Sequence, residues 1–63
     1  MTNHNYKAGS TIKYVPFGGG ERTVVVEDRE DDVKNGRPGF VGTTTDGESV
    51  WGYDYQITQV VKR

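Results

Sequence analysis

The acidic run at residues 27–32, EDREDD, is the part of the chain that comes closest to metal chemistry. Loops rich in carboxylate oxygens hold Ca²⁺ or Mg²⁺ in proteins. If a calcium loop began at Asp31, however, its third position would be Val33 and its twelfth would be Gly42, where such loops need an oxygen ligand and a glutamate. The spacing favours a solvated loop whose charge keeps a sheet edge from pairing with another molecule. A cation bound at residues 27–32 is the alternative.

Other residues that do chemistry in proteins occur singly in this chain. His4 is the only histidine and cysteine is absent, so neither acid–base transfer in a fixed geometry nor a thiolate metal site is indicated. Ser10 and Ser49 lack the surroundings of a nucleophilic serine. The glycines at residues 18–20 are not followed by the Lys-Ser/Thr pair of a phosphate loop. We therefore expect no enzyme activity, no catalytic residue and no cofactor.

Aromatic residues offer binding chemistry of another kind, because their rings stack on bases and grip peptides. In a strand over residues 49–53, Trp51 and Tyr53 share one face while Val50 and Gly52 share the other. Either Val50 is buried and the two rings are exposed, or Trp51 anchors the core and Val50 faces out. The scarcity of large apolar residues favours Trp51 in the core. The aromatic residues are Tyr6, Tyr14, Phe17, Phe40, Trp51, Tyr53 and Tyr55.

Basic residues suggest a third kind of binding. Lys62 and Arg63 are expected near Lys13, because the first and last strands often adjoin in small barrels. These three residues are candidate nucleic-acid contacts. The net charge of −1 lacks the basic signature of nucleic-acid-binding proteins, so such contacts are expected to be weak and sensitive to salt.

Short strands must position these side chains, since no segment shows the 3.6-residue period of an amphipathic helix. Asp46-Gly47 predicts a two-residue hairpin with positive φ at both positions, and Asn35-Gly36 predicts another positive-φ turn. Residues 27–36 are expected to form a polar, charged loop. Period-two runs and β-branched residues predict strands at residues 11–15, 22–27, 40–45, 49–53 and 57–61.

The alternation within these strands predicts one shared core. Gly42 and Gly52 lie inside strands, where glycine commonly marks a bend or a bulge. Strongly curved strands in a small barrel need such bends, and closing the barrel removes its bare edges. The predicted core residues are Ile12, Tyr14, Val24, Val26, Phe40, Val50, Ile57 and Val60.

Length and composition indicate one small folded domain. The chain has 63 residues, 32% of them hydrophobic, and is close to neutral, so its core is small and its stability margin thin. We expect a flexible tail at residues 1–8 and a single domain at residues 9–63. The absence of cysteine and of an apolar N-terminal run favours the cytoplasm. No stretch approaches the roughly 20 apolar residues of a membrane span.

The order of elements resembles the Src-homology-3-like barrel: a hairpin, a long charged loop, two short hairpin strands, one helical turn and a closing strand. The segment Tyr53-Asp54-Tyr55-Gln56-Ile57 is similar to the turn before the last strand of such barrels. The resemblance covers roughly residues 9–62 and implies an all-β, five-stranded antiparallel barrel with one short 3-10 turn before the last strand. Residues 31–40 also resemble short uncharacterised bacterial proteins, which carry no assigned function.

Peptide-binding members of that family carry an aromatic pair and an acidic loop after the first strand. Here the acidic run follows the second strand and no tryptophan pair exists, which argues against proline-rich ligands. The sequence predicts a monomeric, non-catalytic binding module with a protein partner, whose candidate interaction surface is Trp51, Tyr53 and Tyr55 flanked by Arg37. The alternative is a weak nucleic-acid-binding barrel that uses Lys13, Lys62, Arg63 and exposed aromatics. A third hypothesis is self-assembly through a strand edge or through Val25 and Val41.

Overall fold

Alternating inward and outward residues form five antiparallel strands in the computed structural model, which describes residues 6–63. A 3-10 turn, η1 (Asp54–Gln56), precedes the last strand. The predicted all-β architecture, strand number and helical turn are confirmed. The strands are β1 (Thr11–Tyr14), β2 (Arg22–Lys34), β3 (Arg37–Thr44), β4 (Ser49–Tyr53) and β5 (Ile57–Lys62).

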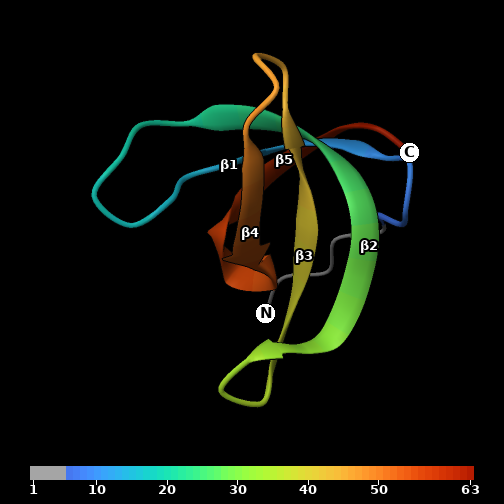
Figure 1. The fold of residues 1–63 in the computed structure, drawn as a ribbon, viewed down its shortest axis with the longest axis vertical. Helices are drawn as coiled ribbons and strands as arrows, with labels where there is room; N and C mark the ends of the chain where they lie inside the picture. Colours follow the sequence, from blue (N-terminus) through green and yellow to red (C-terminus); the bar gives the residue numbers. More distant parts are fainter. Residues whose placement is uncertain (1–5) are drawn as a thin grey trace.

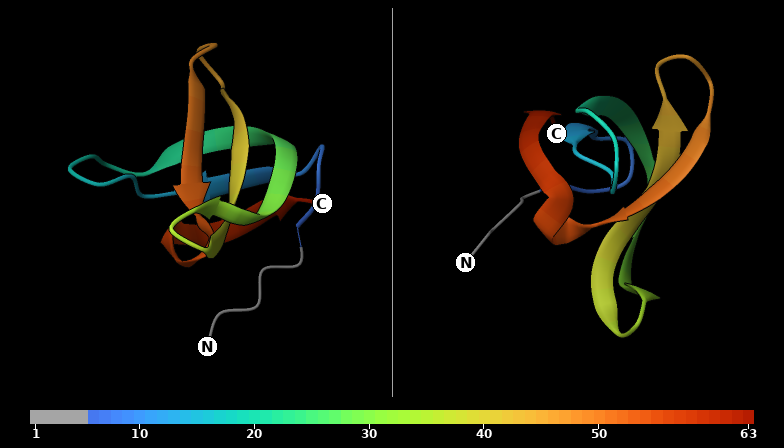
Figure 2. Two further views of the ribbon diagram at one scale, coloured as in Figure 1. Left: turned by 60° about the horizontal axis from the view of Figure 1, so that its bottom comes forward. Right: turned by 90° about the vertical axis from the view of Figure 1, so that its left-hand side faces the viewer.

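The strands form one sheet in the order β4-β3-β2-β1-β5. β2 is the long central strand, and Figure 1 shows it arching from the β1 and β5 side over to β3 and β4. The curvature folds the two halves of the sheet toward each other (Figure 2). β4 and β5 remain the two edges, because no ladder joins them. The sheet is therefore strongly curved but not closed.

β2 is much longer than the sequence predicts. Residues 27–34, expected as a loop, continue the strand and pair with the first half of β3, with Arg29 opposite Phe40 and Glu30 opposite Gly39. The prediction of a loop was wrong for residues 27–34, because pairing with a neighbouring strand outweighs the low β-propensity of acidic residues. A register shift between Val26 and Asp28 marks a bulge where the charged half begins.

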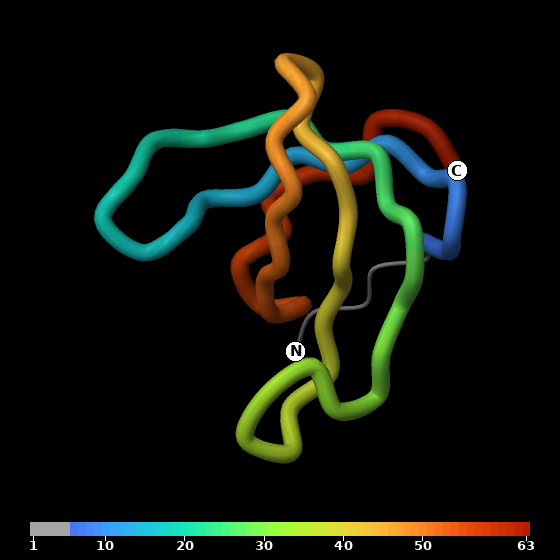
Figure 3. Tube along the Cα trace, viewed as in Figure 1, coloured from blue at the N-terminus to red at the C-terminus, as the bar shows by residue number. Residues whose placement is uncertain are grey.

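The turns follow their residue types, with one difference. Asn35 and Gly36 both have positive φ, 58° and 72°, and close the two-residue β2–β3 hairpin as predicted. At the β3–β4 turn only Gly47 has positive φ, and four residues separate the strands. The predicted two-residue Asp46-Gly47 loop is therefore wrong in length, while its hairpin is confirmed. Figure 3 shows these two turns and the β1–β2 loop projecting from the sheet.

The core lies on the concave side of the sheet. Phe40 is at its centre, with its ring 5.1 Å from that of Tyr14 and 6.4 Å from that of Tyr6, both in edge-to-face contact. Every predicted core residue faces this interior: Ile12, Tyr14, Val24, Val26, Phe40 and Ile57 are buried, and Val50 and Val60 are partly buried against them.

Gly42 and Gly52 make room for this core. A Cβ on Gly52 would lie 2.8 Å from the Phe40 ring and 3.2 Å from Tyr14. A Cβ on Gly42 would meet the backbone carbonyl of Val25 and lie 2.7 Å from a methyl group of Val24. The bulge expected near Gly42 occurs on the facing strand β2, whereas the β3–β4 register is regular at Gly52. Close packing, rather than a bend, explains Gly52.

Tyr6 extends the core beyond the strands. Its side chain is 3% exposed although residues 1–8 were expected to form a tail. Its hydroxyl donates to Asp54 of η1, and the Arg29 guanidinium lies 4.5 Å above its ring. Arg29 also pairs with Asp54 at 3.3 Å. These contacts join Tyr6 to β2 and η1. Residues 1–5, including His4, lie outside the described residues.

The buried tyrosines predict loss of stability in alkali. Burial, and next the hydrogen bond to Asp54, raise the pKa of Tyr6 above its ordinary 10.0, and burial likewise raises the pKa of Tyr14. Both hydroxyls keep their protons in the folded state at pH values where the unfolded chain loses them. The stabilisation is complete below pH 10 and falls as the pH rises further. Denaturant unfolding of Tyr6→Phe should show a shallower fall above pH 10; a slope equal to that of the wild type would contradict it.

Among residues 6–63, no helix has the length and apolar character of a membrane span.

Candidate interaction surface

Four aromatic rings gather on the outer side of the sheet, away from the core. Trp51 and Tyr53 project from β4, Tyr55 from η1 and Phe17 from the β1–β2 loop. The Tyr53 ring stacks on Tyr55 at 5.3 Å and meets Trp51 edge-to-face at 5.4 Å. Phe17 lies 6.2 Å from Tyr53 and 6.5 Å from Tyr55. We call these four residues the aromatic row.

The aromatic row is exposed except at its centre. Trp51 is 44% exposed, Tyr55 56% and Phe17 71%, so the favoured prediction that Trp51 anchors the core was wrong. Val50 takes the inward position instead. Tyr53 is only 6% exposed because the other three rings surround it. The Asn35 side-chain amide also donates to its hydroxyl at 3.2 Å, which ties the β2–β3 turn to β4.

The η1 turn holds Tyr55 in place through a buried amide. The Gln56 side chain accepts a hydrogen bond from the Tyr53 backbone N–H at 2.9 Å and donates to the Val15 carbonyl at 3.0 Å. Both ends of this amide are therefore occupied by backbone groups of different segments. These hydrogen bonds brace the backbone on both sides of Tyr55, and a preorganised aromatic surface loses little entropy when it binds a ligand.

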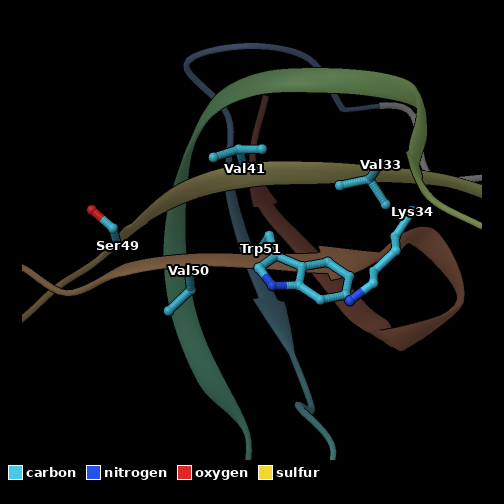
Figure 4. A pocket seen from close by; sticks show the side chains of 6 residues that line it. All are labelled: Val33, Lys34, Val41, Ser49, Val50 and Trp51. Atoms are coloured by element: carbon cyan, nitrogen blue, oxygen red, sulfur yellow. The ribbon is translucent and has the colours of Figure 1, made fainter.

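A groove of about 420 Å³ lies beside Trp51 (Figure 4). Its apolar walls come from three strands, and Lys34 lies at its rim with its ammonium group 5.3 Å from the Trp51 ring. Gly39 on β3 allows Val33 of β2 and Gly52 of β4 to lie close on either side of it, because a Cβ on Gly39 would meet the Gly52 carbonyl and the Val33 side chain. The residues that line the groove are Val33, Lys34, Val41, Ser49, Val50 and Trp51.

Arg37 lies next to the other end of the aromatic row. With Pro38, Asp54 and Tyr55 it lines a smaller hollow of about 230 Å³. The structure therefore brings together Arg37, Tyr55, Tyr53 and Trp51, the residues of the predicted interaction surface. Asp54 is already engaged there by Tyr6 and Arg29.

The three basic candidates belong to the opposite edge of the sheet. β1 pairs with β5, with Thr11 opposite Lys62 and Lys13 opposite Gln59. The expected adjacency of the first and last strands is confirmed. Tyr55 comes just before the other end of β5, where Ile57 pairs with Tyr14. Lys62 and Arg63 are thus separated from the aromatic row by the length of β5.

The acidic residues are spread along β2 instead of lining a loop. Within residues 6–63, no three histidine or acidic side chains converge on a point that could hold a metal ion. Asp28, by its hydrogen bond and its charge, raises the pKa of Glu30, as expected for neighbouring carboxylates on one strand. Asp32 accepts a hydrogen bond from the Gly36 N–H at 2.8 Å and so supports the hairpin turn.

Sequence reasoning missed several residues of this surface. Phe17 was available as a signal, since a large aromatic residue in a glycine-rich loop has no strand face to bury it. Val33 and Lys34 carried no signal, because their position beside Trp51 depends on the unexpected length of β2.

Comparison of the chain with protein-family models, with curated proteins and with solved structures finds no match.

Proposed function

We propose that the protein is a non-catalytic binding module that uses the aromatic row to hold a segment of a protein partner. The exposure of the aromatic row is the observation that supports this proposal. Three large apolar side chains between 44% and 71% exposed touch a common ring, in a chain whose core is completed on the other side of the sheet. Contiguous exposed aromatic surface on a small domain is typical of interaction sites. We further propose that the fold is a Src-homology-3-like barrel and that the domain acts as a monomer in the cytoplasm.

Two cations lie beside the aromatic row and would attract the carboxylates of a peptide. Lys34 flanks Trp51 and Arg37 flanks Tyr55, and within residues 6–63 neither has a carboxylate at ion-pair distance. Aromatic rings with neighbouring cations are frequent at the centres of protein interfaces.

A displayed library of random peptides tests the proposal. Peptides selected on the wild-type domain should bind Trp51→Ala at least about tenfold more weakly, since central tryptophans contribute about 2 kcal/mol or more to interfaces. Val25→Ala is the matched control, because Val25 is also 44% exposed on the outer side but lies on β2. Its affinity should change less than about twofold. Equal weakening in both variants, or amide shifts confined to β1 and β5, would exclude the aromatic row.

The nucleic-acid hypothesis is the second candidate, and the pairing of β1 with β5 favours it by placing Lys13 and Lys62 on neighbouring strands. Titration with single- and double-stranded oligonucleotides at low salt tests it. The hypothesis requires amide shifts at Lys13, Lys62 and Arg63 that fade as salt is added. Without such shifts at low salt it fails.

A further inference from the structure

The outer edge of β4 has unpaired backbone groups. β4 pairs with β3 through five consecutive residue pairs, from Ser49 opposite Thr43 to Tyr53 opposite Gly39, without a register shift. In the described part of the chain no second strand adjoins it. Among the described residues, the backbone of β4 makes one further hydrogen bond, from the Tyr53 N–H to the Gln56 side chain. Half the N–H and C=O groups of an edge strand point away from its sheet, so residues 49–52 present free donors and acceptors.

This edge lacks the features that prevent strand addition. Proteins protect exposed edges with charged residues, prolines and bulges. The other edge strand, β5, has Lys62 and is irregular, with two register shifts against β1. β4 reads SVWGY, which contains no charge and no proline, and its register is regular. The two edges of one sheet therefore differ, and β4 is the one open to pairing.

The free edge and the aromatic row are continuous. Trp51 is the central residue of β4, and the row passes from it through Tyr53 to Tyr55 and Phe17 beyond the end of the strand. A strand that paired with residues 49–52 would place alternate side chains beside Trp51, and its next residues would reach Tyr55 and Phe17. An extended polypeptide is the ligand that satisfies both the free backbone groups and the rings.

The charges at this site select the composition of that polypeptide. Glu48, just before β4, is paired with Arg22 at 2.5 Å, and Asp54, just after it, is paired with Arg29 at 3.3 Å. Lys34 and Arg37 have no such partner among residues 6–63. The acidic residues 27–32 lie on β2, separated from β4 by β3. The site therefore complements apolar side chains and carboxylates.

We propose that β4 accepts an extended segment of a partner protein as a sixth strand of the sheet, and that the side chains of this segment on the outer face, where Trp51 and Lys34 lie together, are apolar and acidic. This inference rests on the proposed function, because it specifies how the partner meets the aromatic row. Backbone hydrogen bonds to residues 49–52 hold the segment in register, apolar side chains cover Trp51, and carboxylates meet Lys34 and Arg37. Strand addition of this type obtains affinity from the main chain and specificity from alternate side chains.

Two synthetic peptides test this inference. The first is a terminally blocked peptide about eight residues long to match a strand, in which every second residue is threonine and the positions between carry valine and glutamate in turn, so that both lie on one face. The second has the same side chains but is N-methylated at every residue, which removes its backbone donors. The first should shift the Trp51 indole resonance and slow amide exchange within residues 49–52 by at least about tenfold. The second should bind at least about tenfold more weakly, and Trp51→Ala should weaken the first while Val25→Ala does not.

Each of the other outcomes contradicts a different part of the inference. If both peptides bind equally at the aromatic row, strand addition is wrong while the proposed function stands. If a valine–lysine peptide binds as tightly as the valine–glutamate peptide, the acidic composition is wrong. If neither peptide binds at up to about 1 mM, a level that corresponds to only about 4 kcal/mol of binding free energy, the inference fails, and the library selection decides the proposed function on its own.

Discussion

Replacing Phe40 with alanine is expected to leave much of the protein unfolded at room temperature. Phe40 is fully buried, and its ring meets those of Tyr14 and Tyr6 edge-to-face. Removing a buried phenylalanine side chain costs about 3–5 kcal/mol, because apolar burial is lost and a cavity remains. At about 0.05–0.15 kcal/mol per residue, a chain of this size has a total stability of only about 3–9 kcal/mol. Urea unfolding followed by circular dichroism measures the loss.

Phe17→Ala is the control for this experiment. The residue type is the same, but Phe17 is 71% exposed in the β1–β2 loop. Its removal should change the free energy of unfolding by less than about 0.5 kcal/mol. The comparison separates the two aromatic groups of the molecule, the core around Phe40 and the outer row that includes Phe17. Similar losses of stability in both variants would mean that this division is wrong.

Replacing Gly42 with alanine is expected to destabilise the protein by about 1–3 kcal/mol or more, the range for overpacking a tight core. The added Cβ would meet the backbone carbonyl of Val25, on the strand that pairs with β3, and a methyl group of Val24. A flexible side chain can rotate away, but a paired backbone cannot move without disturbing the β2–β3 ladder. Thermal or urea unfolding measures the effect.

Gly20→Ala provides the matched comparison. A Cβ on Gly20 would have no atom within 4 Å, and its φ is not positive. Both substitutions restrict the unfolded chain to the same degree, which by itself stabilises a protein by about 0.4–1 kcal/mol. Gly20→Ala should therefore be neutral or stabilising, and the difference between the variants isolates the clash at Gly42. If the two substitutions changed the free energy of unfolding equally, the close contact between β2 and Gly42 on β3 would be contradicted.

The sequence predicted those features that depend on neighbouring residues along the chain. Period-two alternation placed Ile12, Tyr14, Val24 and Val26 in the core, because side chains on a strand point to opposite faces in turn. Asn35-Gly36 predicted its hairpin, since both residues tolerate positive φ. These signals depend only on neighbouring residues, so they can be interpreted without knowledge of the tertiary structure.

Features that depend on which strands meet were not predictable in the same way. The charged half of β2 carries no β signal of its own, and only its pairing with β3 makes it a strand. Trp51 looked like a core residue because large apolar groups are few, yet Phe40, Tyr14 and Tyr6 fill the core without it. Tyr6 lay outside every periodic segment, and it is buried through contacts with residues more than twenty positions away.

By itself, the sequence determined the all-β class, the inward faces of β1 and β2 and the turn before β5, because alternation and turn chemistry act over a few residues. Only the tertiary structure decided that β2 continues through the acidic run, that the aromatic row lies outside the core, and that β4 is left as a free edge. The physical reason is that a side chain's burial is set by the strand packed against it. That strand can lie anywhere in the chain.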